Sequence, residues 1–155
     1  MCGRFALDDR VDEMITEWVL DGNTPHSWAP EGWRPSWNIS PGQSIAVLLE
    51  TALRPGGAVA PRVLEGLWSL LPPWATTPRL SYPTFNARAE TLTTTRSWSG
   101  AVAAHRCVIP ASAYYEWSGP KGSRIPHVVH APDDAPSRWP DCTRGGGPTG
   151  RARGG

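Results

Sequence analysis

Apolar residues recur at helical spacing near the start of the chain. In the segment DDRVDEMITEWVL they fall at i, i+3, i+4, i+7 and i+8, which is one face of an α-helix. Asp8 or Asp9 can cap this helix, and Asp21-Gly22 can end it. The pattern therefore predicts an amphipathic helix between these two signals.

Further along the chain, the apolar positions form short strand-like runs that Pro and Gly turns separate. These runs cover residues 44–50, 62–72, 106–117 and 126–131. The stretch 23–43 contains too many prolines for regular structure, and the segment 87–100 is expected to form a short helix. Together the elements predict an α+β fold of mainly short antiparallel strands with flanking helices.

The length of 155 residues suits one domain with a hydrophobic core. The three cysteines Cys2, Cys107 and Cys142 have neither an even count nor a CxxC spacing, so we expect no disulfide framework and no zinc site. No run approaches the roughly 18 apolar residues of a membrane span, and the N-terminus lacks the pattern of a signal peptide. We therefore expect a cytoplasmic protein that does not contact a membrane.

Charge is distributed unevenly along the chain. The net charge is +1, but residues 137–155 contain four Arg and one Asp and so carry +3. This Gly- and Arg-rich segment is too polar to offset its ordering entropy. We expect a domain over residues 1–136, incomplete at its C-terminal end. Residues 137–155 are then either a disordered basic tail or, the preferred hypothesis, the product of a shifted reading frame in GC-rich DNA.

Four short clusters hold residues whose chemistry would combine if the fold brought them together. Each has an ordinary explanation of its own. Cys2 could be a weakly packed terminal thiol, and Asn38 could support a turn. Glu116 could lie on the solvent face of a strand, and the third cluster could be a polar helix start with an exposed ion pair, formed by Asn86, Arg88 and Glu90. The clusters are MCGRF (1–5), WNISPGQ (37–43), FNARAET (85–91) and CVIPASAYYEW (107–117).

In combination and in this order, the clusters resemble the SOS response-associated peptidase (SRAP) family, whose proteins attach covalently to abasic sites in single-stranded DNA. The similar motifs are Cys-Gly-Arg-Phe, Asn-x-x-Pro-Gly, a Trp-containing strand ending in Pro-x-Trp, Asn-Ala-Arg-x-Glu and Cys-x-x-Pro-x-x-x-Tyr-Tyr-Glu-Trp. The resemblance runs from Met1 to about residue 131 and implies a barrel-like fold and a role in the response to DNA damage.

The chemistry of an N-terminal cysteine agrees with that role. Once Met1 is removed, Cys2 carries an α-amine and a thiol on adjacent carbons. The amine can condense with the C1′ aldehyde of a ring-opened abasic deoxyribose, and the thiol can close onto the imine to give a thiazolidine. Both groups are partly nucleophilic near neutral pH. We expect Cys2 to form the crosslink without a cofactor or metal.

The resemblance also implies roles for other residues. Glu116 is the candidate general acid/base for imine formation, and Asn86 would hydrogen-bond the aldehyde or the ring-opened hydroxyl. Trp68 would form a stacking floor with Asn38 and Pro41 for the bases beside the lesion, although packing in the core is an alternative for Trp68. The residues expected to anchor phosphates are Arg4, Arg88 and Arg96. The expected partner is single-stranded DNA with abasic sites, bound by a monomer that is nucleoid-associated in a bacterial-type cell.

Two other functions stay open. The family name suggests a cysteine peptidase, including one that processes its own Met1, and the chain could also be an inactive remnant that only binds single-stranded DNA. His105 and Cys107 share a strand face, but nothing in the sequence orients the imidazole, and the resemblance implies a structural role for the cysteine. We therefore favour DNA capture, with a peptidase- or lyase-like activity as the alternative.

The chain departs from the family pattern at two points. Ser69 stands where the family usually has Gly, which would crowd a backbone that faces DNA. The late His-x-Arg-Met-Pro-like motif, whose His is thought to assist sugar ring opening and crosslink reversal, does not occur in the chain. His127 and His130 match an earlier strand, so we do not expect either to take over that role.

Overall fold

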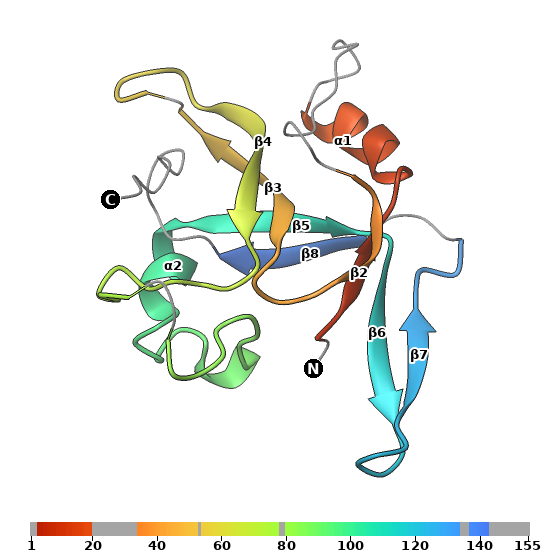
Figure 1. Ribbon diagram of the computed structural model, residues 1–155. Helices are drawn as coiled ribbons and strands as arrows, with labels where there is room; N and C mark the ends of the chain where they lie inside the picture. The colour runs from red at the N-terminus through yellow and green to blue at the C-terminus, as the bar shows by residue number, and fades with distance from the viewer. Residues whose placement is uncertain (1–2, 20–33, 53, 78–79, 134–136, 143–155) are drawn as a thin grey trace, which may run out of the picture.

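The computed structural model describes residues 3–19, 34–52, 54–77, 80–133 and 137–142, with the backbone alone for 17–19 and 137–142. Short strands dominate, and helices are few (Figure 1). In chain order the elements are β1 (Phe5–Leu7), α1 (Val11–Val19), β2 (Ser36–Ile39), β3 (Ser44–Thr51), β4 (Ala60–Leu67), the 3-10 turn η1 (Ala89–Thr91), α2 (Ser99–Ala104), β5 (Arg106–Ala111), β6 (Ala113–Ser118), β7 (Ile125–Val129) and β8 (Ser137–Cys142).

The strands form two four-stranded antiparallel sheets, in the orders β2-β1-β6-β7 and β4-β3-β5-β8. The chain passes from one sheet to the other at Ser112, between β5 and β6, and the two strands run in different directions there (Figure 1). The predicted α+β class with antiparallel strands is therefore confirmed. The sheets that the described strands form are open and do not close into a barrel.

Helix α1 follows the predicted pattern. Val11, Met14 and Ile15 are buried, so the apolar face packs against the core as its spacing indicated. The backbone N–H of Arg10 donates to Oδ1 of Asp8 at 3.2 Å, which satisfies a donor at the start of the helix. The predicted stop at residues 21–22 lies outside the described residues. Within the described ranges, no helix is both long enough and apolar enough to cross a membrane.

The core lies between the two sheets and α1. In β3, the four consecutive residues 45–48 are buried, because both faces of this strand are covered. Phe5 and Leu7 of β1 are almost fully buried as well. Trp68, directly after β4, packs its ring edge-on against Phe5 with 4.9 Å between the ring centroids. A single apolar cluster thus joins the N-terminal strand to the segment that follows β4.

Several predicted elements have different bounds in the structure. The run 106–117 is two strands, β5 and β6, because the chain bends at the buried Ser112. The run 62–72 leaves the sheet after Leu67, where Trp68 exchanges backbone hydrogen bonds with Gly42 and Gln43. The stretch 23–43, expected to be irregular, contains β2 at its end.

The predicted helix over 87–100 is largely wrong. The segment forms only η1 and turns, and α2 begins at Ser99. One cause is visible at Thr94, whose hydroxyl donates to the carbonyl oxygen of Thr91 at 3.2 Å. Threonine side chains that bond to the backbone in this way compete with regular helical hydrogen bonding.

The first six residues of the segment expected to be a disordered tail are ordered as a strand. Residues 137–142 form β8, which pairs antiparallel with β5 from Arg106 opposite Cys142 to Ala111 opposite Ser137. Without β8, this edge of β5 would present unpaired N–H and C=O groups, and pairing them favours order despite the polar composition. Residues 143–155 lie outside the described residues, and disorder or a shifted reading frame there stays a prediction.

Candidate functional site

The start of β1 lies against β6, next to the predicted acid/base Glu116. The backbone N–H of Tyr115 donates to the carbonyl oxygen of Arg4 at 3.0 Å, and Phe5 pairs with Tyr114. Antiparallel pairing therefore continues from β1 back to Arg4. Arg4 lies opposite Tyr115, the residue before Glu116. In Figure 1 the start of β1 has the β6–β7 hairpin on one side and segment 68–98 on the other. Cys2 lies outside the described residues.

Glu116 is half-buried on β6 and lies directly opposite His127 of β7. Because side chains alternate along a strand, Glu116 shares one sheet face with Tyr114 and Ser118, and Tyr115 points to the other face. The carboxylate is thus accessible while its strand is held on both sides by β1 and β7. This position is compatible with the proton transfer predicted for Glu116.

Asn86 directly follows Phe85, whose ring belongs to a series of aromatic contacts that extends back to β1. The indole Nε1 of Trp68 donates to the carbonyl oxygen of Phe85 at 3.3 Å, and the two rings lie edge to face with centroids 6.0 Å apart. The other contact of Trp68 is with Phe5, the residue after Arg4. Trp68 therefore fixes the backbone before Asn86 relative to the start of β1.

The stacking role expected for Trp68 needs correction. Only 6% of Trp68 is exposed, and Phe5 and Phe85 cover it. An indole buried to this extent offers no face on which a base could stack, so the alternative of core packing holds. Ser69 beside it donates or accepts a 3.0 Å hydrogen bond with Thr84, so its hydroxyl fastens the loop that carries Asn86.

Arg4 and Asn38 are brought together although they are far apart in the sequence. The Arg4 Nη1 group donates to Oδ1 of Asn38 at 2.6 Å. Pro41 is half-buried in the turn that follows β2, where Gly42 adopts a positive φ of 87° and donates its N–H to the Trp68 carbonyl oxygen at 2.9 Å. The predicted DNA-binding residues of strands β1 and β2 therefore form one surface beside Trp68.

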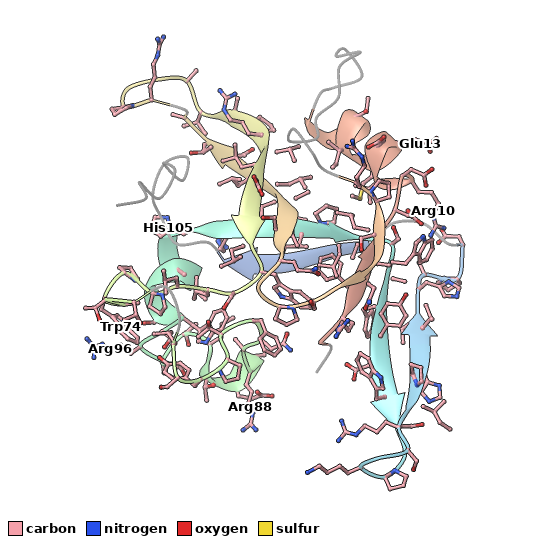
Figure 2. All side chains as sticks on the ribbon, viewed as in Figure 1. Arg10, Glu13, Trp74, Arg88, Arg96 and His105 are labelled. Atoms are coloured by element: carbon pink, nitrogen blue, oxygen red, sulfur yellow. The ribbon has the colours of Figure 1, made fainter. Side chains whose placement is uncertain are left out.

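Arg88 and Arg96 are exposed on segment 68–98 and point in different directions (Figure 2). The guanidinium of Arg96 lies 5.0 Å from the centroid of the Trp74 ring, a cation–π arrangement that holds this side chain in place. The Pro72-x-Trp74 motif marks Trp74 in the sequence, but no local pattern indicates this contact with Arg96. In the view of Figure 2, Arg88 lies nearer than Arg96 to the start of β1.

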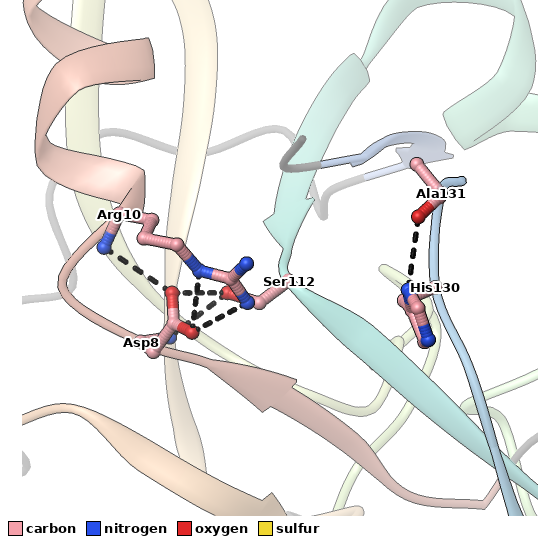
Figure 3. Close-up of polar contacts among 5 residues, drawn as sticks. All are labelled: Asp8, Arg10, Ser112, His130 and Ala131. Atoms are coloured by element: carbon pink, nitrogen blue, oxygen red, sulfur yellow. Dashed lines mark hydrogen bonds and ion pairs between the residues drawn. The ribbon is translucent and has the colours of Figure 1, made fainter. Parts of the chain in front are cut away.

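A buried polar cluster secures the other end of β1 (Figure 3). The Asp8 carboxylate accepts hydrogen bonds from Ser112 Oγ at 2.6 Å and from Arg10 Nε at 2.9 Å. Burial alone would raise the pKa of Asp8, but the hydrogen bonds from Arg10 and Ser112 and the positive charge of Arg10 together lower it below its usual value. Since Ser112 separates β5 from β6, the cluster holds β1 and β6 in register.

The residues of a Cys–His pair occupy different environments. Cys107 is buried in the core, and His105 is exposed at the C-terminal end of α2. A buried thiol cannot meet a peptide substrate, which does not favour a peptidase built on Cys107. Within the parts of the chain that the structure describes, no group of three or more His, Cys, Asp or Glu side chains could hold a metal ion.

Comparison with solved structures supports the fold. Two proteins from Bordetella bronchiseptica, one of them described as phage-related, superpose with TM-scores of 0.61 and 0.62 at 26% identity. The match covers 90% of this chain and 59% or 62% of theirs. A protein from Bacteroides thetaiotaomicron reaches a TM-score of 0.61 at 15% identity, which supports the fold alone.

Curated relatives share about half of their length with this chain. Two abasic site processing proteins of Bacillus subtilis, YoqW and YoaM, are 36% and 34% identical over 118 residues, which is 76% of this chain and 48% or 47% of theirs. An abasic site processing protein of Saccharomyces cerevisiae is 27% identical over 86% of this chain and 40% of its own length. Residues 1–139 match the family described as SOS response associated peptidase. The chain therefore belongs to the SOS response associated peptidase (SRAP) family.

Proposed function

We propose that this protein captures abasic sites in single-stranded DNA as a covalent thiazolidine crosslink through Cys2, after removal of Met1. One observation carries the proposal: the bond from the Tyr115 N–H to the Arg4 carbonyl lays the start of β1 along the strand of Glu116. In that register Gly3 comes opposite Glu116, and Cys2 is bonded to Gly3, so the reactive residue is one peptide bond from the position that faces the carboxylate. The names of the curated relatives support the choice of lesion.

The proposed reaction conserves atoms and electrons. The α-amine of Cys2 adds to the C1′ aldehyde, the former carbonyl oxygen leaves as water, and an imine forms. The sulfur then adds to C1′, and the thiol proton passes to the nitrogen, so the product is a thiazolidine plus one water. Both the loss of water and the ring closure need proton transfer, which a positioned carboxyl group can provide.

Glu116 and Asn86 fit complementary roles in these steps. Glu116 would protonate the leaving oxygen, and Asn86 would hydrogen-bond the sugar oxygens that ring opening exposes. The position of Asn86 is supported through Phe85, whose carbonyl accepts from the Trp68 indole, and through Trp68, whose ring packs on Phe5. The buried Trp68 thus acts in the proposal by positioning Asn86, and not by stacking on a base.

Cationic side chains would bind the DNA backbone on both sides of the start of β1. Arg4, held by Asn38, lies on one side, and Arg88 and Arg96 project from segment 68–98. A chain with a net charge of only +1 can bind a polyanion if its cations gather locally. Such a protein would work as a monomer in the cytoplasm, at the nucleoid when bound to DNA.

The deciding experiment uses single-stranded DNA with one abasic site. The protein is incubated with this DNA and with an undamaged strand of the same sequence, and the products are separated on a denaturing gel. We expect a heat- and detergent-stable adduct with the abasic strand alone, its absence in Cys2→Ala, and its absence when Met1 is retained, as checked by intact mass. A full yield of adduct from Cys2→Ala would overturn the proposal.

The family description favours a second candidate, a peptidase that uses Cys2 and could process its own Met1. Cleavage of unrelated peptides that depends on Cys2, without any DNA adduct, would support this candidate. Binding of DNA that weakens with salt but never becomes covalent would identify an inactive remnant.

A further inference from the structure

The face of the β6–β7 hairpin that carries Glu116 also carries an imidazole. His127 lies directly opposite Glu116 in the antiparallel register, and its Nε2 shares a 2.7 Å hydrogen bond with Oγ of Ser118. Side chains of directly opposed residues have Cβ atoms about 4.5–5.5 Å apart. A carboxyl group, an imidazole and a hydroxyl thus share one face of the hairpin, with the imidazole opposite the proposed acid/base.

The hydrogen bond with Ser118 sets the orientation of the ring. Ser118 lies two residues beyond Glu116 on β6, so it is on the same face and diagonal to His127. An imidazole that is hydrogen-bonded at Nε2 is restricted in the orientations that it can adopt. His127 is itself exposed, so its ring can exchange protons with water while it stays opposite the carboxyl group.

Glu116 needs such an exchange in the proposed reaction. When its carboxyl group gives a proton to the oxygen that leaves C1′, a carboxylate remains and must be reprotonated or balanced before the next transfer. An imidazole can both accept and donate a proton through its ring nitrogens. The proton can therefore pass from imidazolium to carboxylate, and the imidazole regains one from water, so no net proton is gained or lost by the pair.

We propose that His127, oriented by Ser118, is a positioning residue that relays protons between solvent and the Glu116 carboxyl group. The inference rests on the proposed function of Glu116 and extends it to a second strand. His127 is hydrogen-bonded to Ser118 on the strand of Glu116, and in this proposal it acts through Glu116. The neighbouring His130 provides a contrast, because its Nδ1 hydrogen-bonds the backbone carbonyl of Ala131 at 2.9 Å and it lies beyond the end of β7 (Figure 3).

The test compares His127→Gln, Ser118→Ala and Glu116→Gln with His130→Gln as the matched control. Single-turnover rates of adduct formation are measured on abasic single-stranded DNA, and affinity is measured on an undamaged strand. We expect His127→Gln to slow the adduct about tenfold, less than the 10²–10⁴-fold typical of losing a general acid/base itself. Ser118→Ala should give a smaller slowing, His130→Gln should match the unmodified protein, and all four variants should keep its DNA affinity and melting temperature.

A double variant and chemical rescue separate proton relay from simple support of the hairpin. His127→Gln added to Glu116→Gln should cause no further slowing, because without the Glu116 carboxyl group His127 has no group to which it can pass a proton. Free imidazole should restore part of the rate of His127→Ala but not of Glu116→Ala. Slowing that is fully additive, or a His127→Gln rate equal to that of His130→Gln, would overturn the relay while Cys2-dependent adducts still upheld the proposed function. Complete lack of adduct with the unmodified protein would instead overturn the proposed function itself.

Discussion

Arg4 donates from Nη1 to Oδ1 of Asn38 at 2.6 Å, so the first strand of the chain and the second are joined through their side chains as well as their backbones. The hydrogen bond restrains the guanidinium of Arg4 at the surface where we propose that DNA binds. Through this bond we expect Asn38, which carries no charge, to affect binding by positioning Arg4. This pair leads to the first prediction.

Replacing Arg4 by Ala should weaken binding of single-stranded DNA regardless of its sequence and should lower the slope of log affinity against log salt by about one unit. Asn38→Ala should weaken binding less and keep the slope, because the charge remains. Arg54, exposed in the turn between β3 and β4, offers the matched control, and Arg54→Ala should leave both quantities unchanged. Equal effects of Arg4→Ala and Arg54→Ala would contradict a local binding surface.

Glu116→Gln should slow adduct formation by about 10²–10⁴-fold, since glutamine keeps the shape of the side chain but cannot transfer a proton. The affinity for undamaged single-stranded DNA should stay close to that of the unmodified protein. Quenched time courses on abasic DNA measure the rate, and a salt titration of binding measures the affinity. An unchanged rate would contradict the role of Glu116 in proton transfer and would show that it is an ordinary carboxylate on the strand surface.

Trp68→Ala should reduce the free energy of unfolding by about 3–5 kcal/mol, because it removes a buried ring from between Phe5 and Phe85. Trp68→Phe keeps most of the packing but loses the hydrogen bond to the Phe85 carbonyl, at about 1 kcal/mol. Urea denaturation measures both changes. Trp74→Ala, at a partly exposed tryptophan, is the control and should cost much less.

Acid should destabilise the protein partly through Asp8. Its pKa is lower in the folded than in the unfolded chain, so its contribution is complete above the unfolded value and is lost as the pH falls below about 4 towards the folded value. Ser112→Ala removes one hydrogen bond to the carboxylate and should cost about 1–3 kcal/mol at neutral pH. Melting temperatures from pH 7 to pH 3 should show this difference shrinking in acid. A difference that is constant with pH would contradict the assignment.

Gly66→Ala should destabilise β4 because an added Cβ would meet Cγ2 of the buried Val47 at 2.6 Å. Val47→Ala in the same chain removes that methyl group and should recover part of the loss, a coupling that a double-mutant cycle in urea measures. Gly100→Ala is the control, because a Cβ there meets nothing within 4 Å. Independent, additive effects of the two substitutions would show that no such contact limits residue 66.

Several features of the fold follow from local sequence. The spacing of Val11, Met14 and Ile15 predicted α1, since one helical face must be buried whatever it packs against. The run 44–50, apolar without interruption from residue 45 to residue 49, predicted β3, a strand covered on both faces. The motifs from Cys2 to Glu116 also identified the family, because the motifs and their order can be read directly from the sequence.

Other features depend on contacts between distant residues and could not be predicted from local pattern. A tryptophan side chain can stack on a base or pack in a hydrophobic core, and the sequence does not distinguish the two. Only the positions of Phe5 and Phe85 around Trp68 show that it packs in the core. Residues 137–142 became a strand because β5 offered an edge, and no periodicity encodes such an edge.

The sequence by itself determined which chemical groups the protein carries, namely a cysteine at position 2, a carboxylate at Glu116 and the arginines Arg4, Arg88 and Arg96. Only the tertiary structure decided which groups meet. His127 came to lie opposite Glu116, and Asn38 beside Arg4, through the register of paired strands. Register depends on backbone hydrogen bonds and on the burial of side chains from distant segments, so it is a property of the folded chain as a whole.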